Sequence, residues 1–429
     1  MKEYLSIVGG TPLFGDVVVG GAKNAALPLL MATLLSRETS VLENIPDLED
    51  ISVTVRLLRR FGATVTYSNR RVEVSVPEIT ETTAPHALVK MMRASFWVLG
   101  PILARTGFAR VALPGGDAIG ARPVDLHLQG LKKLGADVRI EHGCVVALAP
   151  GGLSPARVVI DYPSVGATHH LMMTAALIEG ETVIEGAARE PEIVEMGSFL
   201  SSMGAEVEGA GTSVVTIRGK KNLSGGHIRL CGDRIEATTY LAAGAVTGGK
   251  VTVNGITADS LSSVLSLFER MGCAISTGEN SVTLESTSRL RAVDFETQPF
   301  PGVPTDTQPI FLAALTRADG TSRINETVFE NRFGHVIEFR KFGAQIHIAG
   351  REATIIGQDQ LHGAFGEGGD IRAVAGLIIL ALMATGQSEI YELHHLDRGY
   401  ENMVEKLRNL GANVIRVPAF DSKEVVLGC

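Results

Sequence analysis

The heptapeptide LGADVRI, residues 134–140, recurs in altered form at five other places in this chain of 429 residues. Each copy has an apolar residue, then glycine, usually alanine, and then an alternating run typical of a β-strand. The six glycines, separated by 68 to 73 residues, are Gly62, Gly135, Gly204, Gly272, Gly343 and Gly411. A regular internal period of this length determines the architecture. We therefore interpret the chain as one unit repeated six times.

A second pattern has the same period: a segment rich in small residues begins 36 to 42 residues before each glycine. These segments begin near Lys23, Arg93, Thr168, Arg234, Asp306 and Arg372. Their Ala, Gly, Leu and Met content, as in residues 24–36 and 373–385, favours helices buried on all sides. Each unit then continues with a strand such as residues 181–185 or 250–254, a second helix that the glycine ends, and a hairpin such as residues 64–75. This alternation predicts an α/β fold.

Six units divide most naturally as three plus three, which predicts two domains. The division is expected within residues 222–232, which contain a Ser-Gly-Gly loop. The sixth unit is short of a strand, because little regular sequence follows Val417. Residues 1–20 can supply that strand. We therefore expect a first domain over residues 21–230 and a second over residues 1–20 plus 231–429.

Composition favours a cytoplasmic protein. The first residues contain no apolar signal core, and the longest nearly uninterrupted apolar run, residues 373–385, is shorter than the roughly 18 residues needed to cross a bilayer. The four cysteines form no Cys-x-x-Cys pair, which favours free thiols over disulfides or zinc. A formal net charge of −8 without a long basic run argues against a nucleic-acid partner. The sequence indicates no oligomeric state.

Polar and charged residues mark the starts of the expected buried helices. They are Lys23, Asn24, Arg93, Arg234, Asp306, Asp370 and Arg372. If the helices of one domain share an orientation, their N-termini gather on one face and form an anion site. Charges in such apolar segments are unfavourable to bury unless they are paired or bind a ligand. The alternative is that each residue only caps its helix or forms a salt bridge.

The segment PGGDAIGARPVDLH, residues 114–127, is too rich in glycine and proline for a regular element. A mobile lid is the natural interpretation. Within it, the planar guanidinium of Arg122 can grip a phosphate or a carboxylate, and Asp117 is placed to transfer a proton. The alternative for Asp117 is an ordinary turn residue.

Eight stretches in order along the whole chain resemble the signatures of the enolpyruvyl transferases, in particular of those that act on UDP-N-acetylglucosamine. They are GGAKNAALPLL (20–30), MMRASFWVLGP (91–101), the lid (114–127), DYPSVGAT (161–168), AAREPEIVEMGSFL (187–200), PTDTQ (304–308), ENRFGHV (330–336) and HHLDRGYENMVEKLRNLGA (394–412). The resemblance implies a two-domain inside-out α/β barrel with three βαβαββ-type repeats per domain, six in all, and an active site between the domains.

The resemblance also implies a reaction: the enolpyruvyl group of phosphoenolpyruvate moves to the 3′-hydroxyl of UDP-N-acetylglucosamine and phosphate is released, the first committed step of peptidoglycan precursor synthesis. Lys23, Asn24, Arg122, Arg372 and Arg398 would hold phosphoenolpyruvate. The residues along the UDP-sugar would be Arg93, Arg122, Pro123, Val124, Asp125, Leu126, Ser164, Val165, Gly166, Asp306 and Val328. The catalytic residues would be Lys23, Arg398, Asp306 as the base for the hydroxyl proton, and Asp117 as a proton carrier.

This chemistry needs an acid, a base and a cationic cradle, so we expect neither a metal nor another cofactor. The pairs His169-His170 and His394-His395 are adjacent in sequence, and adjacent residues rarely converge on one ion as an i, i+4 pair does. We interpret both pairs as structural.

The lid departs from the usual family pattern at Asp117, where most members carry cysteine, although an aspartate form also occurs. An ordinary thiol, with a pKa of about 8.5, is protonated at neutral pH, whereas an ordinary carboxyl, near 3.9, is ionised. Burial and the negative charge of phosphoenolpyruvate would favour the protonated form of Asp117, while Arg122 and Lys23 would favour the ionised form. The antibiotic fosfomycin alkylates the lid thiol in this family, so this lid predicts insensitivity to it.

Three alternatives stay open at this point. The sister enzyme 5-enolpyruvylshikimate-3-phosphate synthase shares the repeat and the chemistry, but its usual motifs resemble this chain less. A non-catalytic relative that binds UDP-sugars would not need Lys23, Asp306 and Arg398 together. RNA 3′-phosphate cyclases use related repeats, but the acidic balance of this chain argues against them.

Overall fold

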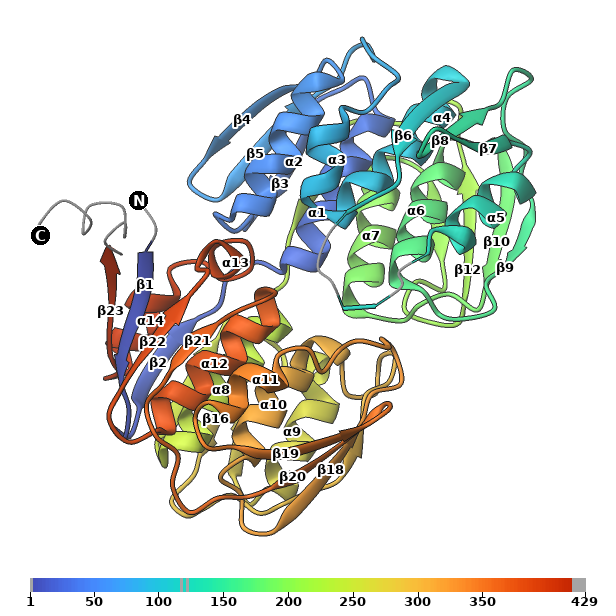
Figure 1. Cartoon of the computed structure of the whole chain (residues 1–429). Helices are drawn as coiled ribbons and strands as arrows, with labels where there is room; N and C mark the ends of the chain where they lie inside the picture. Colours follow the sequence, from blue (N-terminus) through green and yellow to red (C-terminus); the bar gives the residue numbers. More distant parts are fainter. Residues whose placement is uncertain (1–2, 116–118, 121–122, 419–429) are drawn as a thin grey trace, which may run out of the picture. The chain divides into compact units, whose positions relative to one another are not determined.

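The computed structural model describes residues 3–115, 119–120 and 123–418 of the chain (Figure 1). These residues divide into two compact units. The N-terminal unit holds residues 21–115 and 123–231, and the C-terminal unit holds residues 3–20, 119–120 and 232–418.

The three sheets of the N-terminal unit share one strand pattern, in which an outer strand runs parallel to its neighbour and two antiparallel strands follow. In strand order they are β13 (His227–Arg229), β3 (Ser40–Glu43), β5 (Arg71–Ser75) and β4 (Thr64–Ser68); β6 (Phe108–Ala112), β8 (Cys144–Leu148) and β7 (Asp137–Glu141); and β9 (Arg157–Val159), β10 (Gly180–Glu185), β12 (Val214–Gly219) and β11 (Glu206–Glu208). In the second sheet, a parallel bridge between Thr83 and Arg110 takes the place of the outer strand.

The three sheets of the C-terminal unit repeat this pattern. In strand order they are β2 (Phe14–Val18), β14 (Lys250–Asn254), β16 (Ser281–Glu285) and β15 (Ala274–Thr277); β17 (Phe295–Glu296), β18 (Thr321–Asn325), β20 (Glu352–Ile356) and β19 (Gln345–Ala349); and β21 (Phe365–Glu367), β22 (Gln387–Tyr391), β1 (Glu3–Val8) and β23 (Asn413–Pro418). Strand β1 lies between β22 and β23, with Leu5 opposite both Ile390 and Arg416. The expectation that the first residues supply a strand to the sixth repeat is confirmed.

Helices connect the strands of these sheets. Those of the N-terminal unit are α1 (Lys23–Ala32), η1 (Thr33–Leu35), α2 (Glu49–Arg60), α3 (His86–Met91), η2 (Arg93–Val98), α4 (Leu99–Thr106), α5 (Asp125–Lys133), α6 (Val165–Ala176) and α7 (Pro191–Ser202). Those of the C-terminal unit are α8 (Arg234–Thr247), η3 (Ala258–Leu261), α9 (Ser262–Arg270), η4 (Thr305–Thr307), α10 (Gln308–Leu315), α11 (Val336–Arg340), α12 (Ile371–Met383), α13 (His394–Asp397) and α14 (Met403–Asn409).

The helices at the centre of each unit are largely buried, as their composition predicts. Helix α6 packs against α1 and α4, and α8, α10 and α12 pack against one another (Figure 1). Every residue of α10 and of α12 is buried. Each unit has a hydrophobic core of its own around these helices. The predicted α/β fold of six repeats, with helices inside and sheets outside, is confirmed.

Two of the predicted buried helical segments begin where expected, but as 3₁₀ helices. Arg93 opens the 3₁₀ helix η2, and Asp306 lies in the 3₁₀ helix η4, so that the α-helices α4 and α10 begin only afterwards. Both α-helices carry proline in their first turn, Pro101 and Pro309. Because proline has no N–H, it cannot donate the α-helical bond that would extend the helix one turn back.

The repeat glycines adopt the left-handed backbone that ends the second helix of each repeat. Their φ angles lie between 91° and 104°. Only glycine adopts such angles without steric strain. This requirement explains why glycine recurs with the period of the fold.

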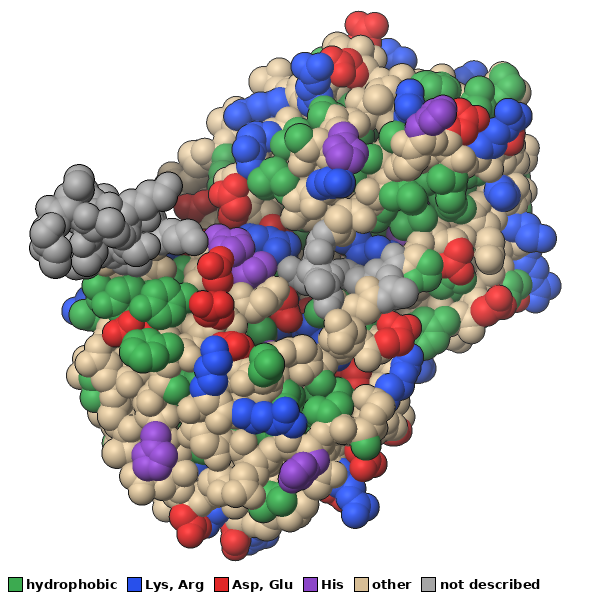
Figure 2. All heavy atoms as spheres, viewed as in Figure 1, with side chains coloured by type: hydrophobic (Ala, Val, Ile, Leu, Met, Phe, Trp, Pro, Cys, Tyr) green, Lys and Arg blue, Asp and Glu red, His purple; other side chains and the backbone are tan. Residues whose placement is uncertain are grey.

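The surface of the described residues carries charges of both signs. Figure 2 shows acidic and basic side chains interspersed over the face in view. Within the described part of the chain, no helix has the length and apolar character required to cross a membrane.

We expect Gly204→Ala to lower the free energy of unfolding by about 1–2 kcal/mol, the usual penalty of a left-handed conformation in a residue with a Cβ. Gly204 has φ of +104° and no atom within 4 Å of an added Cβ, so the substitution tests the backbone alone. Gly151 has the same open surroundings without a positive φ, and Gly151→Ala is the control. Urea denaturation of both variants measures the difference, and equal stabilities would contradict the expectation.

Candidate active site

Lys23 and Asn24 begin the buried helix α1, as predicted. Lys23 is buried, and its Nζ lies 2.7 Å from Oδ2 of Asp50, which is also buried, in the first turn of α2. A buried ion pair requires close partners of opposite charge. The positive end of α1 therefore carries a lysine whose position is determined by a neighbouring helix.

Seven of the residues predicted to line the UDP-sugar lie at or directly before three helix starts in the N-terminal unit: Arg93, Val124, Asp125, Leu126, Ser164, Val165 and Gly166. Nη2 of Arg93, the first residue of η2, donates a hydrogen bond to the carbonyl of Pro123 at 2.9 Å. Val124 follows, and Asp125 and Leu126 are the first two residues of α5. The Arg93 bond thus joins the start of η2 to the start of α5.

Helix α6 contributes the third start. Oγ of Ser164 accepts a hydrogen bond from the N–H of Ala167 at 3.3 Å and caps the helix. Val165 and Gly166 follow as its first residues. Trp97 Nε1, from η2, donates to the carbonyl of Gly166 at 2.9 Å. The structure therefore brings Arg93, residues 123–126 and residues 164–166 into one neighbourhood.

Buried histidines lie beneath this neighbourhood. Nδ1 of His127 lies 3.1 Å from Nδ1 of His170. Burial, followed by His170 and Arg93, lowers the pKa of His127 well below its ordinary value, and burial lowers the pKa of His170 to about 3. Both rings are therefore neutral at physiological pH. In the described part of the chain, no three His, Cys, Asp or Glu side chains are placed to share a metal ion.

In the C-terminal unit, Asp306 lies between two arginines. Its Oδ2 accepts hydrogen bonds from Nη2 and Nε of Arg372 at 3.0 and 3.3 Å, and its Oδ1 lies 3.7 Å from Nη2 of Arg332. Burial alone would raise the pKa of Asp306, but Arg372 and Arg332 lower it more, so the pKa lies well below its ordinary value. Asp306 is therefore ionised at neutral pH.

Asp370 connects the same arginines to the start of α12. Its Oδ1 caps the helix by accepting from the N–H groups of Arg372 at 2.8 Å and Ala373 at 3.1 Å, and it lies 3.5 Å from Nη1 of Arg332. We call Asp306, Arg332, Asp370 and Arg372 the Asp306 cluster. The starts of α10 and α12 meet at this cluster, as predicted for buried helices of one orientation.

Three other predicted residues remain, of which Arg234 also lowers the pKa of Asp306. Arg234 begins α8 behind its cap Asp233, with its guanidinium 5.9 Å from the ring centre of Phe300. The N–H of Val328 donates to Glu326 Oε1 at 2.9 Å, and Glu326 Oε2 accepts from Oγ1 of Thr305, next to Asp306, at 3.0 Å. Arg398 follows α13 directly. Asp117 and Arg122 lie outside the described residues.

Sequence reasoning named neither Asp50 nor Arg332 as a site residue. Asp50 gives no signal in sequence, because acidic residues are common in the first turn of surface helices. Arg332 lies within the stretch ENRFGHV, residues 330–336, which carried part of the family resemblance. That stretch was the available signal for Arg332.

Glu195 of α7 holds the segment that precedes α8. Its Oε1 accepts from the N–H of Cys231 at 2.7 Å, and its Oε2 accepts from the Cys231 thiol at 3.1 Å. The carbonyl of Cys231 accepts from the N–H of Ala22 at 2.9 Å, directly before Lys23. Burial raises the pKa of Glu195 to about 7, although the two bonds from Cys231 lower it.

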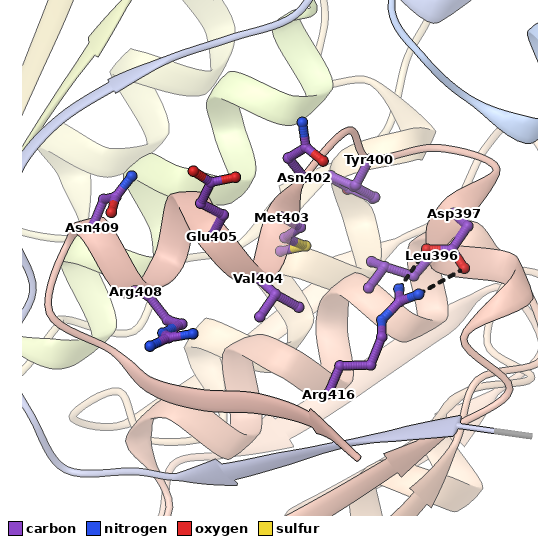
Figure 3. A pocket seen from close by; sticks show the side chains of 10 residues that line it. All are labelled: Leu396, Asp397, Tyr400, Asn402, Met403, Val404, Glu405, Arg408, Asn409 and Arg416. Carbon is purple, nitrogen blue, oxygen red and sulfur yellow. Dashed lines mark hydrogen bonds and ion pairs between the residues drawn. The ribbon is translucent and has the colours of Figure 1, made fainter. Parts of the chain in front are cut away.

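A cavity of about 500 Å³ lies elsewhere in the C-terminal unit (Figure 3). Residues of α13, α14 and β23 and of the loop between the helices line it: Leu396, Asp397, Tyr400, Asn402, Met403, Val404, Glu405, Arg408, Asn409 and Arg416. Arg416 donates to Asp397 at its edge (Figure 3). The ring of Tyr400 also lies 5.7 Å from the guanidinium of Arg372, so Tyr400 is shared between the cavity and the Asp306 cluster.

Comparison with known proteins gives relatives of nearly equal length. The family model of EPSP synthase (3-phosphoshikimate 1-carboxyvinyltransferase) matches residues 7–407. UDP-N-acetylglucosamine 1-carboxyvinyltransferase 1 of Caldanaerobacter subterraneus subsp. tengcongensis is 46% identical over 97% of this chain and 100% of its own. UDP-N-acetylglucosamine 1-carboxyvinyltransferase of Azorhizobium caulinodans is 48% identical over 97% of this chain and 99% of its own.

Solved structures agree with the fold. The enolpyruvyl transferase NikO from Streptomyces tendae superposes with a TM-score of 0.88 at 26% identity, over 98% of this chain and 100% of its own. An EPSP synthase from Acinetobacter baumannii superposes with a TM-score of 0.74 at 16% identity, over 97% of this chain and 100% of its own. The second likeness concerns the fold alone.

We expect Glu195 to make stability depend on pH. Because its folded pKa, about 7, is raised above the ordinary 4.5, its contribution is full below about pH 4.5 and is lost as the pH rises through 7. Glu195→Gln keeps an acceptor for Cys231 but does not titrate, so the parent should lose stability relative to this variant between pH 5 and 8. Urea denaturation across that range measures the difference, with the exposed Glu181→Gln as control. Parallel pH dependences of parent and Glu195→Gln would show that Glu195 does not titrate there.

Proposed function

Because the chain belongs to the enolpyruvyl transferase family, we propose that it transfers the enolpyruvyl group of phosphoenolpyruvate to the 3′-hydroxyl of UDP-N-acetylglucosamine. The observation that carries the proposal is the identity of 46–48%, over nearly the full length, with relatives named for that activity. The reaction would take place in the cytoplasm and would be the first committed step of peptidoglycan precursor synthesis. It would thereby serve cell-wall formation, cell shape and cell division.

The proposed reaction is an addition followed by an elimination. The hydroxyl oxygen attacks C2 of phosphoenolpyruvate and loses its proton to a base, while C3 gains a proton from an acid. The tetrahedral intermediate then loses phosphate from C2 and a proton from C3, which leaves an enolpyruvyl ether. Atoms and electrons balance without an oxidant or reductant, so the two substrates suffice.

We propose that Asp306 is the base and that Arg372 turns from Asp306 toward phosphoenolpyruvate when this substrate binds. Asp306 is ionised and can accept a proton, but Arg332 and Arg372 make it a weak base. A catalytic base works best when its pKa lies near the operating pH. If Arg372 turns toward the negative charges of phosphoenolpyruvate, Asp306 loses its closest cation and becomes more basic. Binding of one substrate would thus prepare the base for the other.

The remaining assignments are proposals of the same kind. Lys23, Asn24, Arg122 and Arg398 would hold the phosphate and carboxylate of phosphoenolpyruvate, with Lys23 at the positive end of α1. Arg93, residues 122–126, residues 164–166 and Val328 would lie along the UDP-sugar. The hydrogen bonds that join the starts of η2, α5 and α6 support a shared ligand for those segments. Asp117 would carry the proton for C3.

We expect the purified protein to release phosphate only when phosphoenolpyruvate and UDP-N-acetylglucosamine are both present. Asp306→Asn should lower kcat by roughly 10²–10⁴-fold, as is typical for loss of a general base. Asp359→Asn is a matched control, because Asp359 is a carboxylate of the same unit that pairs with Arg289 but is 95% exposed. Continuous phosphate detection measures both. Release with shikimate 3-phosphate in place of the UDP-sugar would instead indicate the EPSP synthase activity.

Fosfomycin tests the role proposed for the lid. The parent, with Asp117, should keep its phosphate release after incubation with fosfomycin, because a carboxylate does not replace the thiol that the epoxide alkylates. Asp117→Cys should remain active and become covalently inactivated, and Asp117→Asn should be inactive. Mass spectrometry of the intact protein detects the adduct. Rapid inactivation of the parent, or full activity of Asp117→Asn, would contradict the proposed role.

A further inference from the structure

Arg332 is an almost completely buried cation in the segment between β18 and α11. Its side chain is 1% exposed, and it is among the largest fully buried side chains of the described chain. Burying an unpaired charge is strongly unfavourable, so an arginine in this position must be matched by nearby negative groups. Its surroundings therefore indicate what it does.

Arg332 bridges two helix starts. Its Nη2 lies 3.7 Å from Asp306 Oδ1, and its Nη1 lies 3.5 Å from Asp370 Oδ1. Its Nε donates at 3.4 Å to the carbonyl of Thr305, directly before Asp306. These contacts connect η4, which leads into α10, with the residue that caps α12. The guanidinium thus lies between the two carboxylates, within ion-pair distance of each.

The two oxygens of Asp306 face different arginines. Oδ1 faces Arg332, whereas Oδ2 accepts both hydrogen bonds from Arg372. Arg372 has shorter contacts with Asp306, but in the proposed function it also binds phosphoenolpyruvate. Arg332 can then keep its contacts with Asp306 throughout the reaction, because it has no part in binding phosphoenolpyruvate in the proposed function.

We propose that Arg332 is a positioning residue, which holds Asp306 against Asp370 so that Asp306 stays directed at the sugar hydroxyl when Arg372 turns to phosphoenolpyruvate. This inference rests on the proposed function. Arg332 acts through Asp306 and touches neither substrate. Loss of Arg332 should therefore lower kcat and leave the KM values for both substrates within about threefold.

The test is a double-mutant cycle on phosphate release. Arg332→Gln should lower kcat by roughly 10–100-fold, since a misplacement of about 1 Å in a reacting group can reduce the rate by about 10²-fold. Arg332→Lys, which restores the charge without the planar guanidinium, should recover part of this loss. Combined with Asp306→Asn, Arg332→Gln should lower kcat little further, because residues that act as a unit are not additive. Additive losses, unchanged kcat in Arg332→Gln, or a raised KM with normal kcat would each overturn the proposal.

Arg317 offers a matched control within the same unit. It follows α10, is half-buried, and its Nη1 donates at 3.0 Å to the carbonyl of Met383, the last residue of α12. It thus joins the opposite ends of the two helices that Arg332 joins at their starts. Arg317→Gln should leave kcat at the value of the parent protein, even if the substitution lowers the melting temperature.

The thermal stability of the variants and the phosphate release of the parent distinguish a folding defect, a failure of the inference about Arg332 and a failure of the proposed function. If Arg332→Gln does not fold, as shown by a missing thermal transition, Arg332→Lys carries the same cycle with Asp306→Asn. The single loss in kcat should then be smaller, and additive losses or an unchanged kcat would again overturn the proposal. If the parent releases phosphate and the losses are additive, the inference about Arg332 fails while the proposed function stands. If the parent releases no phosphate with either sugar substrate, the proposed function and this inference both fail.

Discussion

Complete burial of the central helices is the constraint on which the C-terminal unit depends. The first N–H groups of a helix have no partner within it, and burial removes water as an alternative. Aspartates therefore cap two of these helices, Asp233 in α8 and Asp370 in α12. The buried carboxylate of Asp370 in turn requires a cation, which Arg332 supplies. A polar cluster at the helix starts thus follows from burying the helices.

The N-terminal unit meets the same constraint differently. Helix α6 is capped by a neutral side chain, Ser164, and α1 receives no side-chain hydrogen bond at its N-cap. The charge at the start of α1 is instead the cation Lys23, which is paired with Asp50 on a neighbouring helix. A helix start with a lysine and no capping carboxylate suits an anion. One repeated architecture therefore has capping carboxylates at two helix starts of the C-terminal unit and a lysine without a capping side chain at the start of α1.

The sequence predicts the repeats well because each repeat glycine is required by the local backbone conformation. A positive φ after each second helix admits glycine almost exclusively, so the period is visible without knowledge of any contact. The same reasoning did not predict that two buried segments begin as 3₁₀ helices, ahead of the α-helices that hold Pro101 and Pro309 in their first turns. It did not reveal Arg332, whose partners Asp306 and Asp370 belong to distant segments and meet only in the folded chain. Local backbone requirements are readable in one sequence, whereas pairings between buried charges are not.

The pKa of Asp306 also constrains how a base could work in this cluster. Two arginines keep the carboxylate ionised well below neutral pH, which secures its charge but weakens its affinity for a proton. Removing both cations would raise the basicity further, but would leave a partly buried carboxylate poorly compensated. Removing one cation satisfies both demands. Both arginines are buried, but they face different oxygens of Asp306: Arg332 faces Oδ1, and Arg372 binds Oδ2 beside Tyr400. An anion that attracts Arg372 alone would therefore raise the basicity of Asp306 while Arg332 keeps it in place.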